Sequence, residues 1–393
     1  MRLTDSQIAD VKARADCVEI ARDLGAQLRR SGRKWIGSCP VCGGGRRATR
    51  FEVQGDQWVC AVCSDGGDAI RLISRARGCD FRAAVEFLGG ARHLSAEEAE
   101  KLARERRARE EKRERAQADY REKERKRLWQ IWDFAKLGSL DLLDLYFDRR
   151  GLDPIRTASL RAVESLDYFD GEIEDDRGHM RPRLVHKGPA MLAAVIGLDG
   201  RFAGLHTTWL DLLKPDGKAE IRDPATGAIL PAKKVRGTKT AGRIEIVRAA
   251  AAKRLFIGEG IETVRSVEVA LTRTGERRPD DAFWSSVDLG NLGGAALETI
   301  PHPSLKHANG QRQRLPGPQP DLGEPAIPIP DTVEELFLLG DGDSEPVLTQ
   351  TTLARAAARY ARPGRVIREC FAPAGADFND VICGRDTDGK GPP

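Results

Sequence analysis

Four of the eight cysteines in this chain of 393 residues form two Cys-x-x-Cys pairs. Cys39 pairs with Cys42, and Cys60 pairs with Cys63. Each pair can turn two thiolates toward one point, and four thiolates complete a closed tetrahedral site for Zn²⁺. We therefore predict a structural zinc site, which by itself indicates only a small fold held together by metal. The remaining cysteines stand alone and are expected to be ordinary thiols.

Carboxylates follow three apolar runs nearer the C-terminus. The motifs are LFIGEGIET, LFLLGDGDS and GADFNDVI, which place Glu259, Asp341, Asp343 and Asp377 just beyond expected strands. Residues i and i+2 of an extended chain point the same way, so Asp341 and Asp343 can converge on one cation. Open parallel sheets bind ligands beyond the carboxyl ends of their strands. The pattern predicts a site for Mg²⁺ or Mn²⁺ acting on phosphate substrates, although each motif alone is more often a turn or a helix cap.

Basic residues gather in two places, and each group is a candidate for binding nucleic acid or nucleotides. The first lies in the cysteine-bearing segment among aromatic residues and comprises Arg46, Arg47 and Arg50. The second precedes the carboxylates and comprises Lys233, Lys234, Arg236, Lys239 and Arg243. Cations for phosphates beside aromatics for base stacking suit single-stranded nucleic acid. The alternatives are that Trp58 belongs to the core of the ribbon and that the second group is a solvated surface.

The elements that position these residues predict an α+β multidomain protein. Residues 1–92 are a helix, a zinc ribbon and further helices, and residues 93–128 are a densely charged helical linker without Gly or Pro. Residues 129–250 form a mixed α/β region, and residues 251–393 alternate apolar runs with helices, as a Rossmann-like, mainly parallel sheet does. The Pro- and Gly-rich stretch 301–331 is expected to be a flexible insertion.

Within the mixed region, apolar spacing predicts helix over 129–170. Short strands are expected from about residue 181, at 181–188, 191–200 and 202–210. Asp199-Gly200 lies between two of these runs and predicts a hairpin turn.

Composition limits which binding partners and which cellular location the chain can have. Charged residues make up 32% of the chain and the formal net charge is +4, which is compatible with nucleic-acid binding wherever the basic residues cluster. There is no apolar run long enough to span a membrane and no signal-peptide pattern, so we expect a cytoplasmic protein.

The N-terminal part resembles the CHC2-like zinc-binding domain of bacterial and phage-type DNA primases. The resemblance rests on GRKWIGSCPVC, QWVCAVCSDGGD and the segment FRAAVEFL, and covers roughly residues 4–90. The bacterial pattern usually has His as its second ligand, and Cys42 matches the phage type. Within this motif Asp68 is expected to cap a helix.

The acidic motifs resemble the Toprim domain over about residues 252–384. The resemblance implies acid–base or metal-binding chemistry for Glu259, Mg²⁺ binding by Asp341 and Asp343, and a later acidic position at Asp377 in DFND. Asn291 in GNLGG also matches a recurrent segment. Residues 129–250 resemble the part of the catalytic core that precedes Toprim in such primases.

Together the resemblances imply a DNA primase that makes short primers, expected to be RNA, on a single-stranded DNA template from nucleoside triphosphates. No Walker A motif occurs, so a helicase would be a separate candidate partner. Two alternatives stay open. One is a Toprim nuclease of repair or defence, and the other is a non-catalytic DNA-binding accessory protein of replication.

Overall fold

A computed structural model describes residues 4–31, 34–43, 50–63, 65–90, 96–176, 178–306 and 310–385. The chain divides into two compact units, Met1–Gln117 and Ala118–Pro393, which we describe separately. The observed architecture is a mixed α+β protein with a cysteine cluster in its first unit, which confirms the predicted fold class. None of the helices in the described ranges combines the length and apolar character that a bilayer crossing requires.

The first unit is built around a small antiparallel sheet. Two helices precede it, α1 (Asp5–Arg14) and α2 (Cys17–Asp23). The sheet has the order β1-β2-β3-β4-β5, and its strands are β1 (Leu28–Ser31), β2 (Lys34–Gly37), β3 (Phe51–Gln54), β4 (Gln57–Cys60) and β5 (Asp65–Gly67). Helices α3 (Ala69–Arg77) and α4 (Phe81–Phe87) follow.

Local signals in the sequence fix the ends of these helices. Asp68 caps α3 by accepting a hydrogen bond from the Arg71 backbone N–H at 3.0 Å, as its position predicted. Trp58 is buried in the core with Phe51 and Val53, so it serves the ribbon's packing. A core this small gains much of its stability from additional restraints such as a bound metal.

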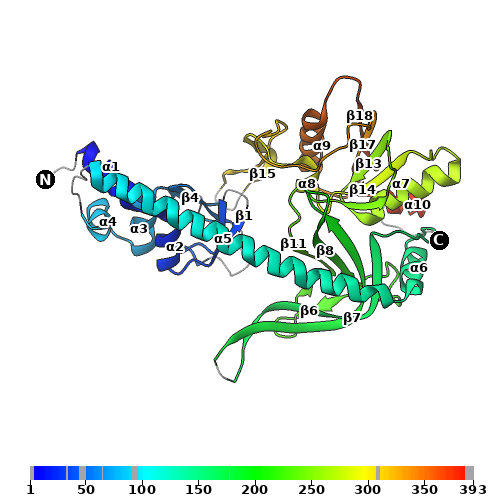
Figure 1. Cartoon of the computed structure of the whole chain (residues 1–393), viewed down its shortest axis with the longest axis horizontal. Coiled ribbons are helices and arrows are strands. Elements are labelled where there is room, and N and C mark those ends of the chain that lie inside the picture. Colours follow the sequence, from blue (N-terminus) through cyan, green and yellow to red (C-terminus); the bar gives the residue numbers. More distant parts are fainter. Residues whose placement is uncertain are drawn as a thin grey trace. The chain divides into compact units, whose positions relative to one another are not determined.

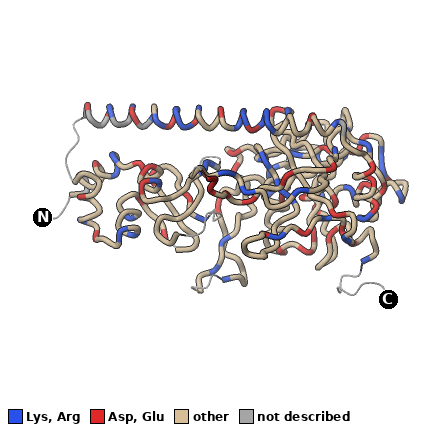
Figure 2. The backbone as a smooth tube through the Cα atoms, turned by 90° about the horizontal axis from the view of Figure 1, so that it is seen from below, with Lys and Arg blue, Asp and Glu red and all other residues tan. Residues whose placement is uncertain are grey.

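Helix α5 (Ala96–Phe134) crosses the boundary between the two units. Lysine and arginine alternate with aspartate and glutamate along it (Figure 2), which suits a helix surrounded mostly by water. Its last turns differ, because Leu128 and Trp132 are buried in the core of the second unit. The helix therefore extends past residue 128, where the sequence placed the end of the charged linker.

The second unit begins with η1 (Ala135–Leu137) and α6 (Leu140–Arg149), followed by an antiparallel sheet. The sheet has the order β11-β8-β7-β6. Its strands are β6 (Leu160–Glu174), β7 (Met180–Ile196), β8 (Phe202–Trp209) and β11 (Lys233–Gly237). The pair β9 (Ile221–Arg222) and β10 (Ile229–Leu230) forms a separate two-stranded sheet.

Two local predictions for this region are wrong. The predicted helix over 129–170 ends at Arg149, and residues 160–170 pair with β7 because the sheet overrides their helical spacing. The strands expected at 181–188 and 191–200 are mostly one strand, β7. Its Pro189 falls where the register with β6 shifts between Val163 and Leu166, so the missing N–H interrupts no regular pair. The turn predicted at Asp199-Gly200 is confirmed between β7 and β8.

A second, mainly parallel sheet carries the carboxylate motifs (Figure 1). Its order is β12-β14-β13-β17-β18, with β12 (Ile244–Val247) antiparallel and β13 (Arg254–Gly258), β14 (Asp281–Ser285), β17 (Glu335–Gly340) and β18 (Val366–Phe371) parallel. The helices around it are α7 (Ile261–Thr274), α8 (Leu289–Gly293), α9 (Pro346–Tyr360) and α10 (Phe378–Ile382).

Both faces of this sheet are buried. Along β13, Leu255 and Ile257 face a core that includes Leu353 of α9, whereas Phe256 faces the core that includes Val264 of α7. Successive strand residues point to opposite faces, so continuous apolar strands such as RLFIG follow from helices covering both sides. The first turn of α7 is thereby held beside the carboxyl end of β13.

The stretch 301–331 was predicted to be flexible, and its described residues are instead built into the fold. Strands β15 (Thr299–Lys306) and β16 (Arg312–Pro316) form a hairpin. The buried Arg355 of α9 donates to the carbonyl oxygens of Gly317 at 2.7 Å and Gly294 at 3.1 Å. Proline and glycine indicate irregular backbone, but the arginine that binds that backbone lies elsewhere in the sequence.

Candidate functional site

The four paired cysteines meet in the first unit. Their sulfur atoms all lie within 4.8 Å of one another, and no other group of three or more metal-binding side chains this compact occurs in the described residues. Cys39 Sγ lies 3.7 Å from Cys63 Sγ, and Cys42 Sγ lies 4.0 Å from Cys60 Sγ. Four thiolates around one Zn²⁺ sit about 3.8 Å apart, far beyond the length of a disulfide bond. The residues therefore fit a structural zinc ion.

Backbone N–H groups complete the metal-binding turns. The N–H of Val41 points to Cys39 Sγ and that of Cys63 points to Cys60 Sγ, each at 3.4 Å. Such bonds stabilise thiolates, which are the form that binds zinc. Cys39 and Cys60 are buried under the sheet, so the metal would tie β2 and β4 to the turn that follows each of them.

The structure describes only one of the three basic residues that were predicted to bind nucleic acid around the ribbon. Arg46 and Arg47 lie outside the described residues, and Arg50 is exposed. Nearby, Arg30 pairs with Glu110 at 2.9 Å and Glu114 at 3.0 Å, both on α5. The guanidinium of Arg22 lies 4.7 Å from the centre of the Trp35 ring. Part of the positive charge expected for nucleic acid is thus balanced within the unit.

The carboxylates meet at the carboxyl edge of the parallel sheet. Glu259 follows β13, Asp341 follows β17, and Asp377 caps α10 after β18. All three line one cavity of about 150 Å³. β13, β17 and β18 are neighbours in the sheet, so their carboxyl ends lie side by side. Asp343 follows in the turn after Asp341 and does not line this cavity.

Gly342 brings the aspartate pair against the segment that carries Asp377. Its N–H donates to Ala376 O at 2.9 Å, and its carbonyl oxygen accepts from the Gly375 N–H at 2.9 Å. A Cβ at this position would lie 2.0 Å from Pro373 O. Only glycine lets the two backbones approach this closely, which explains the spacing Asp-Gly-Asp.

The cavity is electrostatically unfavourable for its own acids. Burial and the charges of Asp377, Asp343 and Glu259 raise the pKa of Asp341 to about 7, against a hydrogen bond from Thr263 Oγ1 at 3.0 Å that lowers it. Burial, with Asp288 next, likewise raises the pKa of Glu259. Crowded carboxylates of this kind are what a divalent cation neutralises, so the donors fit Mg²⁺ or Mn²⁺.

Basic groups line the same cavity. Lys233 Nζ lies 2.9 Å from Glu262 Oε2, and Lys218 Nζ lies 3.9 Å from Glu262 Oε1. Tyr146 donates its hydroxyl proton to the same carboxylate. Burial opposes ionisation of Glu262, but the two lysines and the tyrosine hold its pKa well below the usual value. One buried carboxylate thus fixes two ammonium groups beside the acidic edge.

Several residues of this cavity were missed from the sequence. Lys218, His206 and Arg150 line the cavity, as does Glu262. Glu262 lies three residues after Glu259, a spacing that could have been noticed in the motif EGIET. The other three come from segments whose proximity depends on how the two sheets pack, and no local pattern marks them.

The residues of the second predicted basic group do not face a common site. Lys233 faces the carboxylate cavity, whereas Lys234 faces the other side of β11 and pairs with Asp170 at 3.3 Å. Arg236 pairs with Glu124 at 2.6 Å, and Arg243 pairs with Glu245 at 2.6 Å. Lys239 pairs with Asp288.

Asn291 supports the backbone near this edge. Its Nδ2 donates to Gly242 O at 2.7 Å and to Ser286 O at 2.8 Å, and its Oδ1 accepts from the Ala241 N–H at 2.9 Å. Ala241 and Val287 both have positive φ, at 56° and 74°. Such backbone is costly for these residues, so Asn291 holds two strained turns in place.

Two family models match the chain. Residues 3–104 match the CHC2 zinc finger, which confirms the zinc-binding domain that the sequence predicted. Residues 122–245 match DUF7146, a domain of unknown function. No curated protein matches the chain at a significant level.

Several solved structures of primases are weakly similar to this chain. The zinc-binding and RNA polymerase domains of the Aquifex aeolicus primase are 13% identical, with a TM-score of 0.33, over 98% of this chain and 84% of that one. The DnaG primase catalytic domain bound to ssDNA is 14% identical, with a TM-score of 0.38, over 68% and 78%. The primase fragment of the bacteriophage T7 primase-helicase is 11% identical, with a TM-score of 0.27, over 50% and 59%. Because all three TM-scores are below 0.5, we infer nothing about function from them.

Proposed function

We propose that this protein is a cytoplasmic DNA primase that synthesises short RNA primers on single-stranded DNA. One observation carries the proposal: Glu259, Asp341 and Asp377 line one cavity together with Lys233, at the carboxyl edge of a parallel sheet. The CHC2 zinc finger in the same chain supports it, because that domain resembles the zinc-binding domain of primases. On this proposal the parallel sheet is a Toprim domain.

The acidic edge is where we place a divalent cation. Asp341 and Asp343, with Glu259, would hold Mg²⁺ or Mn²⁺, which neutralises charge on phosphate groups during nucleotidyl transfer. The side chains of the protein would bind and orient the nucleotide. Lys233 is about one third exposed and is fixed by Glu262, so its ammonium is presented to the cavity as a phosphate ligand. Lys218 is more deeply buried and reinforces the positive charge of the cavity.

Template binding is the role we propose for the first unit. Arg50 and the basic residues around it would bind the phosphate backbone of single-stranded DNA. The zinc ion would keep the ribbon rigid enough to present them.

The test is a priming assay with the full-length protein. Single-stranded DNA, labelled ribonucleotides and Mg²⁺ should give short labelled products, and E259Q and D341N should each lower their yield by about 100-fold or more. The matched controls E334Q and D331N neutralise acids on the exposed surface of the same unit and should leave the yield unchanged.

The other candidate functions predict different products. Shortening of the template, lost in E259Q, would replace the primase with a nuclease that uses the same edge. DNA binding without any product, equal in wild type and D341N, would replace it with a non-catalytic binding protein.

A further inference from the structure

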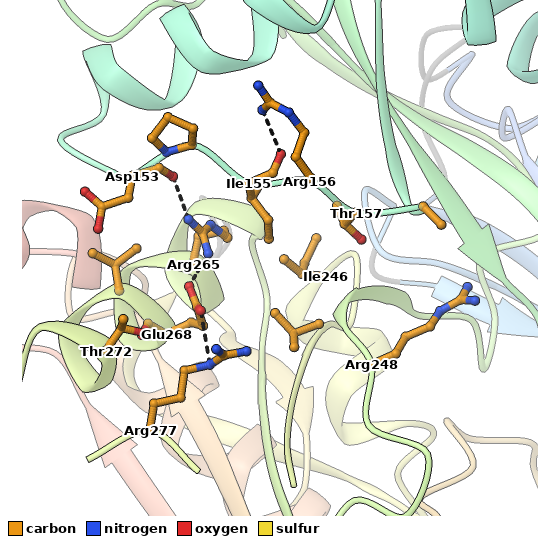
Figure 3. A pocket seen from close by; sticks show the side chains of 14 residues that line it. Asp153, Ile155, Arg156, Thr157, Ile246, Arg248, Arg265, Glu268, Thr272 and Arg277 are labelled. Atoms are coloured by element: carbon orange, nitrogen blue, oxygen red, sulfur yellow. Dashed lines mark hydrogen bonds and ion pairs between the residues drawn. The ribbon is translucent and has the colours of Figure 1, made fainter. Parts of the chain in front are cut away.

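A second cavity of about 500 Å³ lies in the unit Ala118–Pro393 and shares no lining residue with the carboxylate cavity. Its walls are the segment 153–158, the edge strand β12 with the residues after it, and α7 with the loop that follows (Figure 3). The carboxylate cavity is lined by Ile261, Glu262 and Thr263 in the first turn of α7. The second cavity uses the opposite part of that helix, from Arg265 to Thr272.

Arginine is the dominant charged side chain of this cavity. Four guanidinium groups line it, against the two carboxylates of Asp153 and Glu268. The arginines come from four separate places in the chain, and they are Arg156, Arg248, Arg265 and Arg277.

Arg265 is the buried member of the set, with a side chain only 3% exposed. One of its terminal nitrogens pairs with Glu268, and the other donates to Asp153 O at 2.7 Å. Its Nε is buried and has no hydrogen-bond partner among the described residues. A buried donor without an acceptor costs roughly 1–3 kcal/mol, so the fold holds Arg265 as a fixed positive charge behind the lining of the cavity.

The carboxylates cannot satisfy the arginines alone. Glu268 serves both Arg265 and Arg277, whose Nε lies 3.2 Å from Glu268 Oε1. Figure 3 shows this chain running from Arg265 through Glu268 to Arg277. A guanidinium has five N–H donors, so Arg277, whose side chain is 36% exposed, retains donors for a further anion.

Two more arginines stand at the rim. The side chains of Arg156 and Arg248 are each 55% exposed. Their partners, Asp144 and Glu245, lie outside the lining of the cavity, and Glu245 is shared with Arg243. Both guanidiniums are more than half exposed, so phosphate groups of a ligand can reach them from solvent.

The remaining lining is apolar. Ile155 and Val247 are partly exposed and contribute aliphatic surface beside the guanidinium groups, whereas Ile246 and Val269 are buried in the core behind them. An inorganic anion would leave this surface unused. A ligand that carries phosphates at one end and a flat, weakly polar body at the other would cover both, and a cavity of this size is typical for small organic ligands.

We propose that this cavity is a binding site for a nucleoside di- or triphosphate, distinct from the acidic edge. The arginines bind the phosphates bidentately, which is the geometry that guanidinium and phosphate share. The nucleoside packs on Ile155 and Val247, the partly exposed apolar residues of the lining. The proposal is independent of the priming reaction, since none of these residues lines the carboxylate cavity.

Calorimetric titration of the full-length protein with ADP tests the site. No divalent cation is added, because the carboxylates at the acidic edge then repel phosphates, and no chelator is added, so zinc is retained. Wild type should bind ADP at one site, and R248A/R277A should weaken binding by about tenfold or more. R248Q alone, at an exposed position that the fold does not need, should weaken it in the same direction.

Matched controls and competitors make the outcome decisive. R368A removes an exposed arginine on β18, away from the cavity, and should bind ADP as wild type does. Pyrophosphate should bind more weakly than ADP, because it leaves the apolar wall bare. Absence of ADP binding, equal binding by R248A/R277A, or displacement of ADP by a single-stranded oligonucleotide that depends on the same arginines would each overturn the proposal.

Discussion

Asp341 occupies a place where its negative charge is unfavourable. Its pKa is raised to about 7 by burial and by three neighbouring carboxylates. Between pH 4 and 7 the unfolded chain has released this proton while the folded chain retains it. Folding therefore becomes less favourable as pH rises through that window, and above pH 7 the full cost remains.

D341N should remove this cost. A shift of about three pKa units corresponds to roughly 4 kcal/mol, and partial solvent screening reduces the expected gain to about 2 kcal/mol of unfolding free energy at pH 8. Urea unfolding without added divalent cations measures it. The gain should vanish at pH 4, and D331N, at a fully exposed acid, should show none. A variant less stable than wild type at pH 8 would contradict the arrangement of charges described here.

His206 gives the opposite pH dependence. It is buried beside Lys233 and Lys218 with Glu262 nearby, and burial lowers its pKa to about 4. The unfolded chain takes up this proton near pH 6.5, but the folded chain resists until about pH 4. The stability it supports is thus present above pH 6.5 and is lost as pH falls toward 4.

H206Q should make stability less sensitive to acid. Wild type should lose about 3 kcal/mol more than H206Q between pH 7 and pH 4, by the size of the shift. Denaturant unfolding at several pH values gives both curves. H179Q, which replaces an exposed histidine, should retain the wild-type loss. Parallel curves for wild type and H206Q would show that His206 takes up a proton as readily in the folded chain as in the unfolded one.

At the residue scale the structure brings three of the four predicted acids to one cavity, but only Lys233 of the second predicted basic group. Glu259, Asp341 and Asp377 each follow an apolar run, and adjacent parallel strands bring such positions together whatever else the chain does. Lys218 and His206 lie on no motif. Their place at the cavity depends on how the antiparallel sheet packs against the parallel one, which is a long-range property.

At the scale of elements, α9 shows how a distant helix orders an irregular segment. Arg355 is 1% exposed and binds three backbone carbonyls from residues 294–317. The Pro- and Gly-rich composition predicted a flexible insertion, but the described residues form the hairpin β15–β16 and ordered backbone after it. It could not indicate that an arginine some forty residues later would satisfy that backbone.

R355M should loosen the hairpin β15–β16. Methionine fills similar volume but leaves the carbonyls of Gly294 and Gly317 without their donor, at a cost of about 3 kcal/mol. Hydrogen exchange should accelerate over residues 299–317 while β13 and β17 stay protected. R368M, on an exposed strand position, is the control. Unchanged exchange in the hairpin would show that its order does not depend on Arg355.

At the scale of the whole molecule, α5 is one helix with two kinds of support. Its first half belongs to the unit Met1–Gln117, where Arg113 pairs with Asp16 at 3.0 Å and Glu110 pairs with Arg30 at 2.9 Å. Its last turns belong to the second unit, anchored by Leu128 and Trp132. Its charge pattern predicted the helix from sequence, but the apolar residues at its end were needed to see that it continues into the next core.

Zinc removal should separate these two supports. Binding of zinc by four thiolates contributes on the order of 10 kcal/mol to a small fold, so a chelator should unfold the ribbon and the residues that rest on it. Hydrogen exchange should then accelerate over residues 16–77 and over the described part of α5 before residue 117, because Arg113 and Glu110 lose their partners. Residues 128–134 and the parallel sheet should keep their protection, and calorimetry should show one of two transitions moved to lower temperature.

C60S should reproduce the effect without chelator, whereas C370S, at a lone cysteine of the second unit, should not. Simultaneous loss of protection in both units would mean that the second unit cannot fold without the first.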